Sequence, residues 1–277
     1  MFLPNCVIIL LNPEISLKSQ EVKSRWFSIL KENMVLSLKR QEIEVEKISS
    51  FCGRIIIDCK NPLMVVNGLK NCFGISSFFI AEKRKTTNMN EICVNVSDLC
   101  ENNLDSTFAV RGKSFCKNFS SKDLEIALGS EVLKNFPELK VKLKEPKSEF
   151  FCLAIKGYSY FYFKEIKGIG GLPVSTQGTS VFVANKFAEK LGFLLLKSGI
   201  NIIYCGKNDL SSLEKYNSFK VIKKVEEKKI SELFNEGKIM AVFSDATNEK
   251  ELNGCVKRIG LKPLAPLYVD SPKTPFD

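Results

Sequence analysis

The chain contains no histidine among its 277 residues. Histidine is the commonest metal ligand, and it is the side chain whose charge changes most readily near neutral pH. Its absence excludes every Ser-His and Cys-His catalytic arrangement and removes the nitrogen ligands of most zinc sites. The sequence therefore offers no histidine-based catalytic or metal site.

The ten cysteines include no CxxC pair. The closest regular spacings, Cys52/Cys59 and Cys93/Cys100, are too loose for a zinc site and have no histidine partners. Most of the cysteines lie in apolar strand or helix contexts. We therefore predict no metal site, and we predict buried free thiols in a reducing cytoplasm for Cys6, Cys52, Cys59, Cys152 and Cys205.

The sequence also lacks a hydrophobic run as long as a transmembrane helix. Residues 1–11 are apolar, but no basic leader accompanies them, and Asn12-Pro13-Glu14 ends the run. We expect a first buried strand there rather than a signal peptide. The prediction is a cytoplasmic protein without a membrane partner.

The formal net charge is +10, and both halves of the chain carry an excess of lysine and arginine. Such an excess favours an anionic partner such as RNA. An ordinary lysine-rich proteome gives proteins of the same charge, so composition alone leaves both interpretations open.

Apolar residues in the first 81 positions follow strand and helix periods in turn. Strands are predicted at residues 6–11, 42–48, 54–59 and 75–81, and helices at residues 16–40 and 62–72. Cys52-Gly53 marks a turn between two of the strands. The order βαββαβ is that of the ferredoxin-like motif, in which two helices cover one face of a four-stranded sheet.

A second α+β unit follows. Helices are predicted at residues 90–104 and 121–136, and strands at residues 107–111, 140–143, 150–155 and 158–164. Lys156-Gly157 joins the last two strands as a hairpin. The aromatic residues at 158–163 could stack nucleic-acid bases. The alternative is that they fill the core, with one hydrogen-bonded tyrosine face.

Gly168, Gly170, Gly171 and Pro173 mark an irregular linker into the C-terminal part. Beyond it, the sequence predicts strands at residues 181–184, 200–205 and 239–244 and helices at residues 186–197, 230–237 and 248–259. This alternation is typical of a small doubly wound, Rossmann-like α/β domain. Residues 261–277 contain four prolines and are expected to be extended.

In such domains the first strand-to-helix turn binds phosphate, through glycine backbone at the helix N-terminus. Here the turn consists of Ala184-Asn185-Lys186, without a glycine and without an acid that would hold Mg²⁺. The position suits a nucleotide, but the residues do not.

Three motifs lie in a single order along the chain: PEISLKSQ at residues 13–20, FAVRGK at residues 108–113 and GIGGLPV at residues 168–174. Together they resemble the tRNA 4-thiouridine synthetase (ThiI) family over about residues 6–205. The resemblance implies a ferredoxin-like domain, a THUMP domain and a PP-loop ATPase domain. In that family the first two domains bind tRNA. The third adenylates a uridine with ATP, and a cysteine persulfide then supplies sulfur.

The family's PP-loop, S-G-G-x-D-S, has lost both glycines, the aspartate and both serines in this chain. The corresponding loop consists of Val183, Ala184, Asn185, Lys186, Phe187 and Ala188. Lys186 could contact a phosphate, but one lysine does not make an ATP site. We therefore predict no cofactor, and ATP with Mg²⁺ only if the chain is an enzyme after all. Cys205 and Cys255 are sulfur carriers only formally, and structural positions in a strand and a helix suit them better.

Cations near the motifs are the best candidates for RNA contacts, because rigidly held cations suit the phosphates of a folded RNA. Three belong to the first helix, three to the FAVRGK strand and the loop after it, and three alternate along one face of a strand. They are Lys18, Lys23, Arg25, Arg111, Lys113, Lys117, Lys140, Lys142 and Lys144. The alternative for each is a solvated surface residue.

We therefore expect an α+β N-terminal half, ferredoxin-like plus THUMP, followed by a small Rossmann-like α/β domain. The predicted boundaries are residues 1–85, 86–166, a linker at 167–179, and a truncated PP-loop-like domain at 180–277. The preferred function is a non-catalytic, tRNA-binding adaptor that holds tRNA for a separate modifying enzyme. An active tRNA sulfurtransferase making 4-thiouridine is the main alternative, and a protein-interaction scaffold is the third. A homodimer stays open.

Overall fold

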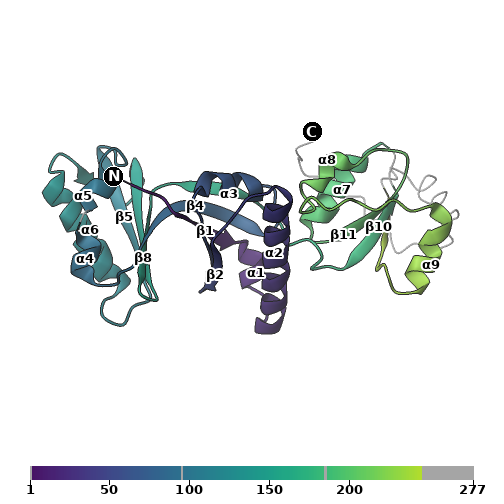
Figure 1. Ribbon diagram of the computed structural model, residues 1–277, viewed down its shortest axis with the longest axis horizontal. Coiled ribbons are helices and arrows are strands. Elements are labelled where there is room, and N and C mark those ends of the chain that lie inside the picture. Colours follow the sequence, from purple (N-terminus) through teal and green to yellow (C-terminus); the bar gives the residue numbers. More distant parts are fainter. Residues whose placement is uncertain (1, 95, 184–185, 245–277) are drawn as a thin grey trace. The chain divides into compact units, whose positions relative to one another are not determined.

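The computed structural model describes residues 2–94, 96–183 and 186–244 (Figure 1). The chain folds into two compact units, each assembled from three segments. Unit 1 consists of Met1–Leu10, Glu44–Asn67 and Ser77–Lys167, and unit 2 consists of Leu11–Ile43, Gly68–Ser76 and Gly168–Asp277. Segments distant in the sequence therefore share a core in both units.

One large sheet contains most of the described strands. Its members are β1 (Cys6–Leu11), β2 (Lys47–Phe51), β3 (Arg54–Asp58), β4 (Ile75–Arg84), β5 (Thr107–Ser114), β6 (Lys140–Val141), β7 (Ser148–Ile155), β8 (Tyr158–Tyr162) and β9 (Glu165–Gly170). The order is β2-β3-β1-β4-β8-β7-β5-β6, with β9 also paired to β4. β3 is antiparallel to both β1 and β2, whereas β5 is parallel to β7.

Helices cover one face of the sheet in unit 1. These are α4 (Met89–Cys93), α5 (Val96–Cys100) and α6 (Ser121–Asn135), which lie beside β5 in Figure 1. Because side chains alternate along a strand, Phe108 and Val110 of β5 face the helices and share a buried core with Leu124 and Leu128 of α6. A further helix of this part of the chain is α3 (Pro62–Leu69).

The aromatic strand β8 fills the core on the other face of this sheet. Tyr160 and Tyr162 are buried in a cluster with Ile8 of β1 and Phe79 of β4. The rings of Phe79 and Tyr162 lie with their centroids 4.8 Å apart. Burial raises the pKa of the Tyr162 hydroxyl to about 12. The core interpretation of this strand is therefore confirmed, and Tyr160 and Tyr162 present no open ring to a ligand.

Unit 2 contains a second, smaller sheet. Its strands are β10 (Thr179–Val183), β11 (Asn201–Cys205) and β12 (Val242–Ser244), in the order β11-β10-β12, and β10 is parallel to both neighbours. The helices of this unit are α1 (Pro13–Ser16), α2 (Gln20–Arg40), α7 (Ala188–Lys197), α8 (Ser211–Glu214) and α9 (Ile230–Asn235), with a 3₁₀ turn η1 (Glu227–Lys229). Phe182, Leu196 and Leu213 belong to its core.

Several predicted elements differ from the structure. The helix predicted at residues 16–40 begins only at Gln20, because the Ser19 side chain accepts from the Val22 amide and caps α2 there, and the separate short helix α1 ends at Ser16. The strand predicted at 42–48 begins only at Lys47. Residues 90–104 form two short helices, since Val94 is extended after α4. The predicted irregular linker contains β9, which pairs with β4. The helix at 248–259 and the tail at 261–277 lie outside the described residues.

The cysteines of the described residues are free thiols, and Cys6, Cys59, Cys152 and Cys205 are buried as predicted. The prediction for Cys52 is wrong: it is exposed, because it occupies the tight turn between β2 and β3 with φ of 45°. Burial raises the pKa of Cys59 to about 11, so this thiol stays protonated and unreactive at neutral pH.

The described residues contain neither a ligand cluster for a metal ion nor a helix that could cross a membrane. No group of three or more cysteine, aspartate or glutamate side chains there is arranged to hold a metal ion. None of the helices in that part of the chain combines the length and apolarity needed to cross a bilayer.

Candidate nucleic-acid interface

The outer edge of β5 is held by side chains from α6. The Gly112 amide donates to Oε1 of Glu125 at 2.9 Å, and the Ser114 amide donates to Oγ of Ser121 at 3.0 Å. A side chain at Gly112 would meet the Ser121 carbonyl at 3.0 Å, so glycine permits the close approach of strand and helix. The FAVRGK motif and the serines after it therefore form one rigid edge.

A capping box begins α6 at the end of the loop that follows β5. Oγ of Ser120 accepts from the Asp123 amide at 3.1 Å, and Oδ2 of Asp123 accepts from the Ser120 amide at 2.8 Å. The hydrogen bonds donated by Ser120 lower the pKa of Asp123 below its ordinary value. The box fixes one end of the loop that carries Lys117.

Substituting Ser120→Ala is expected to lower the unfolding free energy of unit 1 by about 1 kcal/mol at pH 7, because an N-cap is lost. The pKa of Asp123 is lower in the folded protein than its ordinary value of about 4. The contribution of this carboxylate to stability is therefore complete above about pH 4, and it is lost as the pH falls through the folded-state pKa. Amide hydrogen exchange of α6, at pH 7 and at a pH below the folded-state pKa of Asp123, measures this loss of stability. Ser28→Ala, at an exposed position of α2, is the control. An equal loss of α6 protection in that variant would contradict the prediction.

The Arg111 side chain is engaged in contacts within the protein. Its Nε donates to Oε1 of Glu149 on β7 at 2.7 Å, and its Nη2 donates to the carbonyl of Leu143 at 2.8 Å. Both side chains of the ion pair are 38% exposed. The role proposed for Arg111 stays a prediction, but its charge is largely compensated by Glu149.

Lys113 is exposed and lies among cations that the sequence did not place near it. Its Nζ lies 5.9 Å from the ring centroid of Phe115, and the guanidinium of Arg54 lies 5.7 Å from the same centroid. Phe115 meets Phe51, and Nζ of Lys156 lies 4.5 Å from the Phe51 centroid. We name Arg54, Lys113 and Lys156 the basic cluster. Within the part of the chain that the structure describes, none of these three cations forms an ion pair.

The other predicted cations of this part of the chain, Lys117, Lys140, Lys142 and Lys144, are exposed. Lys117 lies in the loop before α6. The strand predicted at 140–143 is shorter, since β6 ends at Val141. The amides of Lys140 and Lys142 still donate to carbonyls of the strand region beside them, whereas Lys144 lies in a bend. The predicted alternation therefore extends over Lys140 and Lys142 only.

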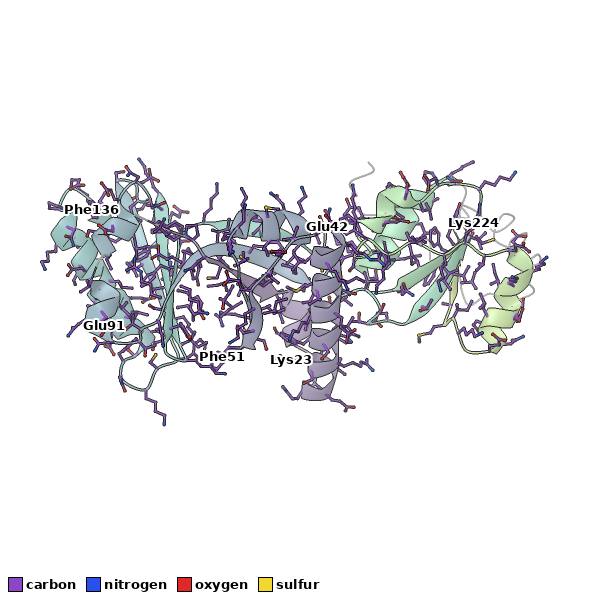
Figure 2. The ribbon with its side chains drawn as sticks, in the orientation of Figure 1. Lys23, Glu42, Phe51, Glu91, Phe136 and Lys224 are labelled. Atoms are coloured by element: carbon purple, nitrogen blue, oxygen red, sulfur yellow. The ribbon has the colours of Figure 1, made fainter. Side chains whose placement is uncertain are left out.

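The three N-terminal candidates belong to unit 2. Lys18 precedes α2 rather than lying on it, and its Nζ lies 5.2 Å from the centroid of the Trp26 ring. Lys23, labelled in Figure 2, is partly buried on α2, and Arg25 is exposed there. A helix turns 100° per residue, so positions two apart point to different sides. Lys23 and Arg25 therefore do not share one face.

The loop expected to bind phosphate in an active enzyme lies between β10 and α7. Phe187 is the N-cap residue of α7, and Glu189 occupies the first turn of that helix. A carboxylate at a helix N-terminus stabilises the helix but repels a phosphate at the same place. Ser212 donates to this carboxylate and holds it. Glu189 therefore places an unfavourable negative charge beside a loop whose sequence already lacks the glycines of a PP-loop.

Sequence reasoning missed Arg54 and Lys156 of the basic cluster, and it missed both phenylalanines. Phe51 and Arg54 flank the turn at Cys52-Gly53, and Lys156 lies within the turn at Lys156-Gly157, but the sequence identified these turns only as connections. Phe115 follows the end of β5. A basic or aromatic residue beside a predicted hairpin turn was the available signal.

Residues 86–162 match the family model of the THUMP domain. Among curated sequences, a probable tRNA sulfurtransferase of Thermoanaerobacter pseudethanolicus is 29% identical over 167 residues, which cover 58% of this chain and 43% of that protein. The chain spans about half the length of the curated relatives it matches.

Two solved structures share the fold over nearly the whole chain. The protein PH1313 from Pyrococcus horikoshii has a TM-score of 0.77 and 24% identity, covering 93% of this chain and 92% of that one. A 4-thiouridine synthetase, solved as an RNA complex with bound ATP, has a TM-score of 0.72 and 18% identity, covering 92% and 78%. At such identities the likeness concerns the fold.

Proposed function

We propose that this chain, in which residues 86–162 match the THUMP domain and which is similar to probable tRNA sulfurtransferases, binds tRNA. The observation that carries the proposal is the basic cluster. Its three cations come from the start of β3, the end of β5 and the β7–β8 turn, and they meet around one pair of rings. Cations held on strands and tight hairpins suit the phosphates of a folded RNA, which is recognised by its shape.

The finer architecture is part of the proposal. The strand order β2-β3-β1-β4, with α2 and α3 in the connections, supports a ferredoxin-like domain at residues 1–85. It would be followed by the THUMP domain at 86–166 and, after the linker at 167–179, a Rossmann-like remnant of a PP-loop domain at 180–277. The three parallel strands of unit 2 support that last assignment.

We further propose that the protein is a non-catalytic adaptor, which holds tRNA for a separate modifying enzyme. The support is the loop at residues 183–188, which lacks the glycines and the acid of a PP-loop, and Glu189 in the first turn of α7. A triphosphate would meet the Glu189 carboxylate there. A cytoplasmic location and a homodimer remain predictions.

One observation favours the alternative, an active tRNA sulfurtransferase. The curated relatives carry that name, and the described fold follows that of the 4-thiouridine synthetase over 92% of this chain. ATP decides between the two functions. Calorimetry with Mg-ATP, and thiolation of tRNA with ATP and a persulfide donor, should give no signal for an adaptor. Catalytic turnover would show that the protein is an enzyme and not an adaptor, and the proposal of tRNA binding would still stand.

Binding itself is tested by titrating purified protein with tRNA at several salt concentrations. We expect the logarithm of the association constant to fall with the logarithm of salt with a slope of roughly −2 to −3, as for three phosphate contacts. A protein–protein scaffold would bind tRNA no better than an unrelated protein of equal charge. That result would remove tRNA binding from the proposal.

A further inference from the structure

Two phenylalanines lie at the centre of the basic cluster, and one of them, Phe115, is exposed to solvent. Phe115 is 38% exposed, and Phe51, labelled in Figure 2, is partly buried at the end of β2. Their ring centroids lie 5.5 Å apart at an interplanar angle of 80°. Full burial of a phenylalanine side chain is worth about 2 kcal/mol, so the exposure of Phe115 forgoes part of that stabilisation. We propose that this pair stacks an unpaired RNA base whose phosphates are held by the basic cluster.

The ligand class follows from the chemistry of the pair. A flat π system can lie on a phenylalanine ring, and every nucleobase has such a face, so stacking tolerates any sequence. The three cations around the rings supply the partners for the phosphates on either side of a base. A paired base is not available for this contact, because both of its faces are covered within a helix. The site therefore takes single-stranded RNA, and the inference rests on the proposed tRNA binding.

The pair is held by backbone hydrogen bonds, not by the ligand. Phe51 is paired with Arg54 across the β2–β3 hairpin, which fixes both side chains of that hairpin on one rigid element. The Phe115 amide donates to the Ala154 carbonyl of β7 at 2.9 Å, which continues the β5–β7 ladder beyond β5. Lys156 and Gly157 both have positive φ, as in the tight turns that join β-hairpins. A preformed platform needs little ordering when a base arrives.

Four neighbouring aromatic residues of this sheet cannot serve instead. Phe151 and Tyr162 stack on each other with centroids 5.1 Å apart, and Tyr162 belongs to the buried core. The rings of Phe150 and Phe161 are fully buried on the helical face. In contrast to these four, Phe115 combines an exposed ring with cations lying over it, and Phe51 lies beside it with Lys156 over its ring.

The test uses the full chain and a short RNA carrying 2-aminopurine, presented either single-stranded or as a duplex. Stacking on the pair should quench the fluorescence of the single strand. Phe115→Leu keeps the apolar volume but removes the ring face, and it should weaken single-strand binding about tenfold and duplex binding less than twofold. Phe115→Trp retains a ring and should retain both quenching and affinity.

Phe234→Leu in unit 2 is the matched control, because Phe234 is 41% exposed. Unchanged single-strand affinity in Phe115→Leu would overturn the inference while tRNA binding persists. An equal loss for single strand and duplex would also overturn it, because the contact would then be to the backbone alone. Failure of the wild-type protein to bind any tRNA is a different result, since it removes the proposed function as well.

Discussion

Reversing the three charges of the basic cluster, in Arg54→Glu, Lys113→Glu and Lys156→Glu combined, is expected to lower tRNA affinity at least about a hundredfold. Each cation–phosphate contact near the surface contributes about 1 kcal/mol, and three lost contacts correspond to about two decades in the dissociation constant. The carboxylates that replace them add repulsion. The slope of the logarithm of affinity against the logarithm of salt should decrease in magnitude by about 2 to 3, because the counterions of three phosphate contacts are no longer released on binding.

Filter binding or fluorescence anisotropy at several salt concentrations measures both quantities. The control reverses three exposed lysines of unit 2, as Lys223→Glu, Lys224→Glu and Lys229→Glu, which changes the net charge by the same amount. Lys224 is labelled in Figure 2. We expect the control to keep most of the affinity and most of the salt slope. Equal losses in the two triple variants would mean that the net charge, and not the basic cluster, binds tRNA.

Arg111 is deliberately left out of this combined variant. Its guanidinium joins Glu149 on β7 to the Leu143 carbonyl, so reversing it places two carboxylates side by side and frees a backbone acceptor. A loss of tRNA affinity in such a variant would combine altered structure with altered charge. The basic cluster avoids this ambiguity, because its side chains lie over rings and not in ion pairs of the described residues.

Substituting Gly171→Ala is expected to lower the unfolding free energy of unit 2 by about 3 kcal/mol. Gly171 has φ of +71°, which costs a side-chain-bearing residue about 1–2 kcal/mol. A Cβ atom there would lie 2.6 Å from the Lys197 carbonyl oxygen and 3.0 Å from the Phe73 ring. The close approach is fixed by the Leu172 amide, which donates to the same Lys197 carbonyl at 2.9 Å. Overpacking of this kind adds about 1–3 kcal/mol.

Urea unfolding followed by the fluorescence of Trp26 measures this loss, because the chain has a single tryptophan and Trp26 is buried on α2 in unit 2. Gly237→Ala is the control. Gly237 has φ of +70° and would meet nothing within 4 Å, so only the conformational cost of about 1 kcal/mol remains. If both variants lost the same stability, the contact with α7 at Gly171 would contribute nothing.

Much of the fold could be predicted from local patterns. The two-residue period gave β3 and β7 nearly to their ends, and the helical period gave the start of α6 at Ser121. Errors occurred where a neighbour decides the local structure. β9 forms because β4 offers it a partner strand, although its sequence is rich in glycine. β6 is short, and the lysine alternation beyond it has no strand to follow.

The sequence by itself determined which chemistry is missing from this chain. Histidine is absent, and the loop at residues 183–188 lacks the glycines and the acid of a PP-loop, and neither fact depends on how the chain folds. Tertiary structure alone decided which cations are available. It paired Arg111 with Glu149, 38 residues away, and brought Lys156 beside Phe51. Because interactions between charges and rings act over a few ångströms, only the packing of strands from distant segments could reveal the basic cluster.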